Sequence, residues 1–178
     1  KTMKKLNFPK DFDWGTASSG PQSEGSKDKL HESVWDYWYK KDKDRFFEKV
    51  GPKVTCDSYH RYKEDIKLMA EMGFKTYRFS IAWTRLIPNG TGEVNQAGID
   101  HYNDVINTCL EYNIEPLVTM FHFDMPDALD KRGSWSNPES VDWFVNFAKV
   151  MFENFGDRVK YWLTINEQNM LTLVGPII

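Results

Sequence analysis

The sequence predicts an α/β fold of about four strand-helix units, the N-terminal half of a (β/α)8 TIM barrel. Segments rich in β-branched and aromatic residues alternate with segments of helical periodicity. Strands begin near residues 74, 115 and 159, and eight units at this spacing would need roughly 350 residues, as in a barrel with insertions. We therefore treat residues 1–178 as one domain, whose C-terminal part is absent from this chain.

An open doubly wound sheet is the structural alternative. The glycines within residues 15–20 lack the spacing of a dinucleotide-binding fingerprint, which argues against it. The first two strands are predicted over residues 12–17 and 75–81. A long polar loop through about residue 54 and a helix over residues 59–72 separate them, with Gly73 where a helix C-terminal cap is expected.

The same alternation continues through the second half of the chain. A helix is predicted over residues 96–112, a strand over residues 116–122, a helix over residues 137–155 and a strand over residues 159–166. Residues 136–138 supply a capping side chain and an early proline for the third of these elements.

Composition narrows the classes of partner. Of the residues, 40% are hydrophobic, and the net charge of −3 comes from 23 basic and 26 acidic residues spread along the chain. No basic arm points to nucleic acid, and no apolar run predicts a secretory signal or a membrane span, so a cytoplasmic location is expected. A homo-oligomer is left open. Cys56 and Cys109 are expected to be reduced, partly buried thiols.

Polar residues close three of the predicted strands. Arg78 lies on the second, His122 ends the third with Asp124 just after it, and Asn166 and Glu167 end the fourth. Because the carboxyl ends of parallel strands meet at one face of a barrel, where active sites form, we expect these side chains to converge.

Each of these residues also has an ordinary structural interpretation. A strand-terminal glutamate is often a solvated loop acid, His122 alone can be a satisfied structural histidine, and Arg78 half of an ion pair. Glu167 at the mouth of an apolar barrel could instead have its pKa raised by desolvation and act as a general acid. His122 and Asp124 lack the accompanying Cys/His spacing of a zinc site, so no metal is expected.

Separated motifs in a fixed order point to one family. Residues 8–25 read FPKDFDWGTASSGPQSEG, residues 77–88 read YRFSIAWTRLIP, and residues 122–126 and 164–167 read HFDMP and TINE. Together they resemble the N-terminal portion of glycoside hydrolase family 1, the family of β-glucosidases and 6-phospho-β-glucosidases. The resemblance spans nearly the whole chain and implies a catalytic (β/α)8 barrel.

The resemblance implies roles for five residues. Glu167 would be the acid/base carboxylate, and Arg78 would orient the nucleophile. Gln22, His122 and Asn166 would bind sugar hydroxyls, Asn166 the 2-hydroxyl. A retaining glycosidase also needs an ionised carboxylate about 5 Å from the acid. In the family it lies in a Glu-Asn-Gly-type motif, which we expect beyond residue 178.

Two positions depart from the family pattern. Gln168 stands where many relatives have proline, which removes a rigid turn but no catalytic atom. Phe123 stands where glucosidases acting on plain sugars commonly have tryptophan, and it resembles the branch that cleaves 6-phospho-β-glucosides. The phosphate-binding residues of that branch lie in a C-terminal loop outside this chain.

The resemblance thus implies hydrolysis of β-glucosidic bonds with retention, and Phe123 favours 6-phospho-β-glucosides taken up by a phosphotransferase system. A plain β-glucosidase, a 6-phospho-β-galactosidase and a noncatalytic sugar-binding fragment are the alternatives. No cofactor is implied, because two carboxylates and a water complete the chemistry. With only one of those carboxylates, the isolated 178 residues are expected to be inactive.

Overall fold

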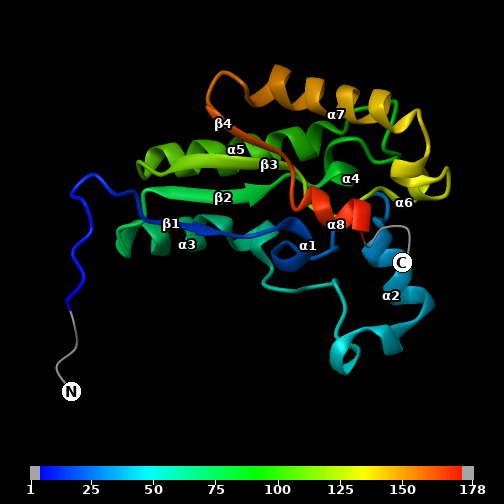
Figure 1. The fold of residues 1–178 in the computed structure, drawn as a ribbon, viewed down its shortest axis with the longest axis horizontal. Helices are drawn as coiled ribbons and strands as arrows, with labels where there is room; N and C mark the ends of the chain where they lie inside the picture. Colours follow the sequence, from blue (N-terminus) through cyan, green and yellow to red (C-terminus); the bar gives the residue numbers. More distant parts are fainter. Residues whose placement is uncertain (1–4, 174–178) are drawn as a thin grey trace.

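The computed structural model describes residues 5–173, which form one parallel sheet with helices packed along it (Figure 1). The strands are β1 (Gly15–Ala17), β2 (Thr76–Ser80), β3 (Glu115–Phe121) and β4 (Tyr161–Ile165). They lie in the order β1-β2-β3-β4, and each neighbouring pair is parallel. Strands that follow one another in chain order with a helix between them are the repeating units of a (β/α)8 barrel.

Three long helices connect the strands and form one layer against the sheet. They are α3 (Ser58–Glu71), α5 (Gln96–Glu111) and α7 (Ser140–Phe155). In this layer α5 contacts both α3 and α7, and it also packs on β3. Figure 1 shows these helices running along the strands.

Shorter helices gather near the carboxyl ends of the strands, to the right in Figure 1. The α-helices are α1 (Gly20–Ser23), α2 (Val34–Lys41), α4 (Trp83–Leu86), α6 (Asp127–Asp130) and α8 (Gln168–Leu173), and the 3-10 helices are η1 (Lys43–Arg45), η2 (Phe47–Lys49) and η3 (Ser134–Ser136).

The prediction of a long polar loop from residue 18 through about residue 54 is wrong, because α1, α2, η1 and η2 lie within it. A capping box starts α2: the Asp36 carboxylate accepts the backbone N–H of Ser33 at 2.9 Å, and the Ser33 side chain bonds the backbone of Asp36.

Helix ends show where local sequence rules hold. Helix α3 ends as predicted at Gly73, whose φ is +84°. The N–H of Gly73 donates to the carbonyl of Ala70, and that of Phe74 to the carbonyl of Met69, both at 3.0 Å, which is a Schellman motif.

Helix α7 begins at Ser140, three residues later than predicted. Asn137 is extended, with φ −83° and ψ 125°, because it precedes Pro138, whose ring disfavours helical backbone at the preceding residue. The Asn137 side chain still accepts the N–H of Glu139 at 2.9 Å, so it orders the turn that leads into the helix.

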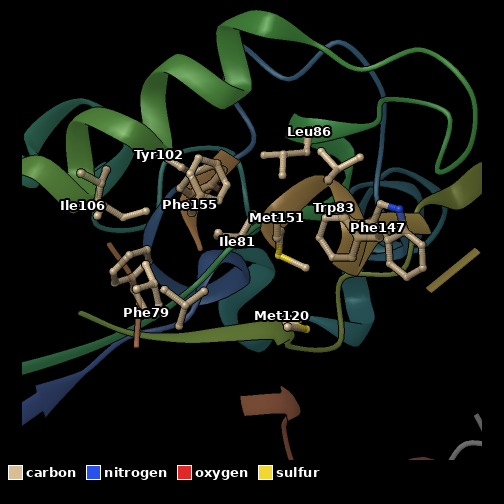
Figure 2. Close-up of a cluster of buried hydrophobic side chains, with 14 of the residues drawn as sticks. Phe79, Ile81, Trp83, Leu86, Tyr102, Ile106, Met120, Phe147, Met151 and Phe155 are labelled. Carbon is tan, nitrogen blue, oxygen red and sulfur yellow. The ribbon is translucent and has the colours of Figure 1, made fainter. Parts of the chain in front are cut away.

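The core lies between the sheet and the helix layer (Figure 2). Within the core the Trp83 and Phe147 rings stack, with centroids 4.5 Å apart and planes 5° apart. Other fully or almost fully buried side chains around this pair are Phe79, Ile81, Leu86, Tyr102, Ile106, Met120, Met151 and Phe155. Gly98 lets α5 approach α4 closely, because a Cβ there would lie 2.0 Å from the Arg85 carbonyl oxygen.

The outer strand β4 is much less covered than the central strands. Tyr161 is 59% exposed and Leu163 38%, whereas Val118 and Thr119 of β3 are fully buried. Among the described residues β4 pairs only with β3, and β1 only with β2. The two outer strands thus leave open edges of the kind that neighbouring strands of a closed barrel would cover.

Two further expectations concern the cysteines and membrane-spanning segments. Both cysteines are free thiols. Cys109 is buried, and burial raises the pKa of its thiol to about 12. The expectation of partial burial is wrong for Cys56, which is exposed. Between residues 5 and 173, no helix has both the length and the apolar character needed to cross a bilayer.

Candidate active site

The carboxyl ends of the strands open into a cleft of about 740 Å³. Asp124, which the sequence also placed at this face, is buried and does not line the cleft. The predicted site residues that do line it are Gln22, Arg78, His122, Asn166 and Glu167. They come from four different strand ends or the turns that follow them. The predicted convergence of these side chains is therefore what the structure shows.

Gln22 lies on α1, the helical turn that follows β1. The backbone N–H of Gly20 donates to the Ser80 hydroxyl at 2.7 Å, which fixes this turn against the end of β2. The hydroxyl of buried Ser19 donates to Oε1 of Gln22 at 2.7 Å. With its oxygen engaged, the Gln22 amide is left to donate through Nε2 to a group in the cleft.

A buried ion pair anchors the C-terminal end of α1, at Glu24. Arg85 donates from Nε to Oε2 of Glu24 at 2.7 Å, and its side chain is only 2% exposed. The Tyr102 hydroxyl donates to the other Glu24 oxygen at 2.7 Å, and the Arg85 guanidinium lies over the Tyr59 ring, 3.7 Å from its centroid. Such a pair is stable only when further hydrogen bonds satisfy it, as they do here.

Arg78 lines the cleft and connects three neighbouring strands. Its Nη2 donates to Oδ1 of Asn166 at 2.6 Å, and its Nε donates to the hydroxyl of Thr119 at 2.9 Å. A guanidinium has donors only, so both partners must present oxygen atoms. Arg78 therefore ties β2 to β3 and to the end of β4.

The turn that carries His122 is held in an unusual backbone conformation. Phe123 has a φ of +65°, in the left-handed region, and its carbonyl accepts the indole N–H of Trp35 at 2.8 Å. Asp124 follows, buried, and burial raises the pKa of its carboxyl to about 6. Left-handed backbone at a bulky residue is strained and persists only where the surroundings impose it.

Electrostatics keep His122 neutral near pH 7. Burial lowers the pKa of its imidazole below the ordinary value, the Arg78 charge lowers it further, and the Glu167 charge acts in the opposite direction. Its Nδ1 is buried and has no hydrogen-bond partner among residues 5–173. A neutral imidazole carries one donor and one acceptor, which suits the recognition of a hydroxyl.

Glu167 sits where β4 passes into α8. Its φ is +46°, and its carbonyl accepts the N–H of Met170 at 2.8 Å. The side chain is exposed, so the described residues do not themselves supply the desolvation expected of a general acid in an enclosed barrel mouth. That covering would have to come from outside this set of residues.

Sequence reasoning missed three residues that support the site: Ser19, Trp35 and Thr119. The capping box before α2 could have placed Trp35 on a helix, but not against Phe123, 88 residues away. Thr119 looks like any β-branched strand residue.

The described part of the chain contains no group of three or more His, Cys, Asp or Glu side chains that could hold a metal ion.

Solved structures of β-glucosidases resemble this chain closely. A variant of the rice β-glucosidase Os3BGlu6 in a covalent complex with Glc superimposes with a TM-score of 0.88 at 45% identity, over 93% of this chain and 35% of that one. The Thermotoga maritima β-glucosidase in complex with castanospermine gives a TM-score of 0.90 at 46% identity, over 94% and 38%. These likenesses confirm the predicted class, the N-terminal half of a (β/α)8 barrel.

The family follows from the sequence. The family model "Glycosyl hydrolase family 1" matches residues 4–177, and the chain belongs to this family. It is 51% identical over 165 residues to the 6-phospho-beta-glucosidase GmuD of Bacillus subtilis, covering 92% of this chain and 36% of that protein. It is 46% identical over 177 residues to Beta-glucosidase A of Thermotoga maritima, covering 98% and 40%. The chain thus spans less than half the length of these relatives.

Proposed function

We propose that the protein containing this chain hydrolyses β-glucosidic bonds with retention of configuration, with Glu167 as general acid and base. The observation that carries the proposal is the cleft itself. Among the described residues that line it, Glu167 is the one carboxylate, and it lies with two amides, an imidazole and a guanidinium. Supporting it, the related rice enzyme is described in a covalent complex with Glc, and a covalent glycosyl-enzyme is the intermediate of retention.

The residues divide the reaction between them. Glu167 would protonate the leaving oxygen in the first step and, once ionised, take a proton from water in the second. Gln22, His122 and Asn166 would hold sugar hydroxyls, and Arg78 would orient the nucleophile. We propose that the nucleophilic carboxylate comes from residues beyond this chain, since retention needs two carboxylates about 5 Å apart.

The division between the two carboxylates is open to a direct test. The 178-residue chain and the full-length protein should be assayed on an aryl β-glucoside 6-phosphate and on the plain aryl β-glucoside. We expect turnover by the full-length protein alone, because an acid without a nucleophile cannot form the glycosyl-enzyme. Turnover by the 178 residues in isolation would contradict the proposed division.

For the substrate we propose a 6-phospho-β-glucoside taken up by a phosphotransferase system, and hence a cytoplasmic location. Phe123 lines the cleft beside His122, and one relative is a 6-phospho-beta-glucosidase. Other relatives are named β-glucosidases, so a plain β-glucosidase is the main alternative, with a 6-phospho-β-galactosidase next. Equal or faster hydrolysis of the plain glucoside by the full-length protein would reject the phosphorylated substrate.

A noncatalytic sugar-binding fragment is the alternative from another class. It would retain the hydroxyl-binding residues of the cleft without the reaction. The mass of the natural chain separates the two: a length well above about 400 residues would favour the complete barrel enzyme with insertions, whereas a length near 178 residues would favour the binding fragment.

A further inference from the structure

Thr119 lies on the inner strand β3 and bonds to Arg78, which lines the cleft. It is fully buried on β3, and in the strand register it lies opposite Ser80 of β2 and Leu163 of β4. Its hydroxyl oxygen accepts the Nε–H of Arg78 at 2.9 Å. A buried donor left without its acceptor is costly, so this bond restricts where the guanidinium can lie.

The second bond of Arg78 determines the orientation of the Asn166 amide. Because a guanidinium can only donate, the amide atom 2.6 Å from Nη2 must be the oxygen Oδ1. The nitrogen Nδ2 is therefore turned the other way, and Asn166 lines the cleft. In this orientation Asn166 offers a hydrogen-bond donor to a ligand oxygen.

We propose that Thr119 is a positioning residue that acts through Arg78 to hold the Asn166 amide with its nitrogen toward the 2-hydroxyl oxygen of the sugar. This inference rests on the proposed glycosidase function. The planar fork of Arg78 places Nε and Nη2 in a fixed relation, so anchoring Nε on Thr119 also fixes the direction in which Nη2 points. Without the Thr119 hydroxyl, the fork is free to rotate away from Asn166.

The test uses the full-length protein with two substitutions at one position. Thr119→Val keeps the shape and loses the hydroxyl, and Thr119→Ser keeps the hydroxyl. Both are assayed on an aryl β-glucoside, in whichever phosphorylation state the wild type hydrolyses, and on its 2-deoxy counterpart. We expect Thr119→Val to lower kcat/KM about tenfold or more on the 2-hydroxy substrate and about threefold or less on the 2-deoxy substrate.

Thr119→Ser should stay within about threefold of the wild type on both substrates, because the acceptor for Arg78 remains. An equal loss on both substrates in Thr119→Val would mean that the hydroxyl acts through the fold, or through the nucleophile that Arg78 would orient, and not through Asn166. Either outcome would overturn the proposal. So would a Thr119→Val enzyme that matches the wild type on the 2-hydroxy substrate.

Crystal structures of the two variants provide a readout that does not need activity. We expect the Arg78–Asn166 hydrogen bond to be broken in Thr119→Val and kept in Thr119→Ser. If the guanidinium and the amide stay in place without the hydroxyl, Thr119 does not position them. A wild-type protein that hydrolyses neither glycoside would reject the proposed function, while these structures would still decide the role of Thr119.

Discussion

The two sides of the cleft differ in how far this chain supports them. Arg78 lies on the inner strand β2, and His122 directly follows the inner strand β3. The side chains of these two strands pack against the helix layer or bond to one another. Glu167 belongs to the end of β4, which is paired along one edge and carries exposed Tyr161 and Leu163. The side with Arg78 and His122 is thus built within these residues, whereas the side with Glu167 depends on further polypeptide to enclose it.

The largest expected effect is at the side with Glu167. In the full-length protein, Glu167→Gln should lower kcat/KM about 10³-fold on a glucoside with a poor leaving group, because the departing oxygen can no longer be protonated. A glucoside with a very good leaving group needs no such proton, so its glycosylation rate should change little. Steady-state and burst kinetics on the two substrates measure the difference. An unchanged rate on the poor leaving group would remove Glu167 from the mechanism.

The core packing that supports the side with Arg78 and His122 can be tested by substitutions on α7. Phe147→Ala removes the ring stacked on Trp83 in the core and should lower the free energy of unfolding by about 3–5 kcal/mol. Phe152→Ala is the matched control on the same helix, since Phe152 is half exposed, and it should cost about 1 kcal/mol. Urea denaturation of the full-length variants measures both. An equal loss of free energy of unfolding in the two variants would mean that the stacked ring contributes no more to stability than the half-exposed Phe152.

The turn beside His122 should respond to pH through Asp124. Burial raises the pKa of Asp124 to about 6, above the unfolded value near ~4. The folded state therefore binds this proton more tightly, and the stabilisation present below pH ~4 is lost as the pH rises through about 6. Relative to Asp124→Asn, the wild type should lose up to about 3 kcal/mol across this window. If the free energies of unfolding of the two proteins ran parallel across this pH range, the raised pKa of Asp124 would be contradicted.

The smallest effect concerns the Gln22 amide. Ser19→Ala removes the hydroxyl that holds Oε1 of Gln22, and we expect KM to rise about three- to tenfold with little change in kcat. If Ser19 acts through Gln22, the same substitution should have no further effect in a Gln22→Ala background. Additive effects in the double variant would show that Ser19 contributes independently of Gln22.

The convergence of the site could be predicted from the sequence because it follows from parallel strands alone. Once Arg78, His122 and Glu167 were placed at strand ends, the topology brought them to one face. The support beneath them could not be predicted in this way. Thr119 has no local signature that separates an acceptor for Arg78 from a packing residue. The strand register places Arg78 opposite Leu117, so Thr119 lies two residues further along β3 on the same face, where the long Arg78 side chain reaches it.

Errors in the predicted elements have local physical causes. Residues 34–41 contain valine, tryptophan and tyrosine, but the polar residues on either side of them hid α2, although its capping box was present. The start of α7 shifted because the proline rule at Pro138 outweighed the capping side chain of Asn137. Glu167 and Phe123 both adopt left-handed backbone, which no residue-type preference would assign to either.

The hydrogen bond between Trp35 and Phe123 sets an order of events during synthesis. The indole N–H and the carbonyl that accepts it are 88 residues apart, with β2, α5 and β3 between them. A ribosome makes Trp35 several seconds before its acceptor, at about 5–20 residues per second. Helix α2 can form early through its own cap, but this wall of the cleft has to wait until β3 has emerged and folded beside β2.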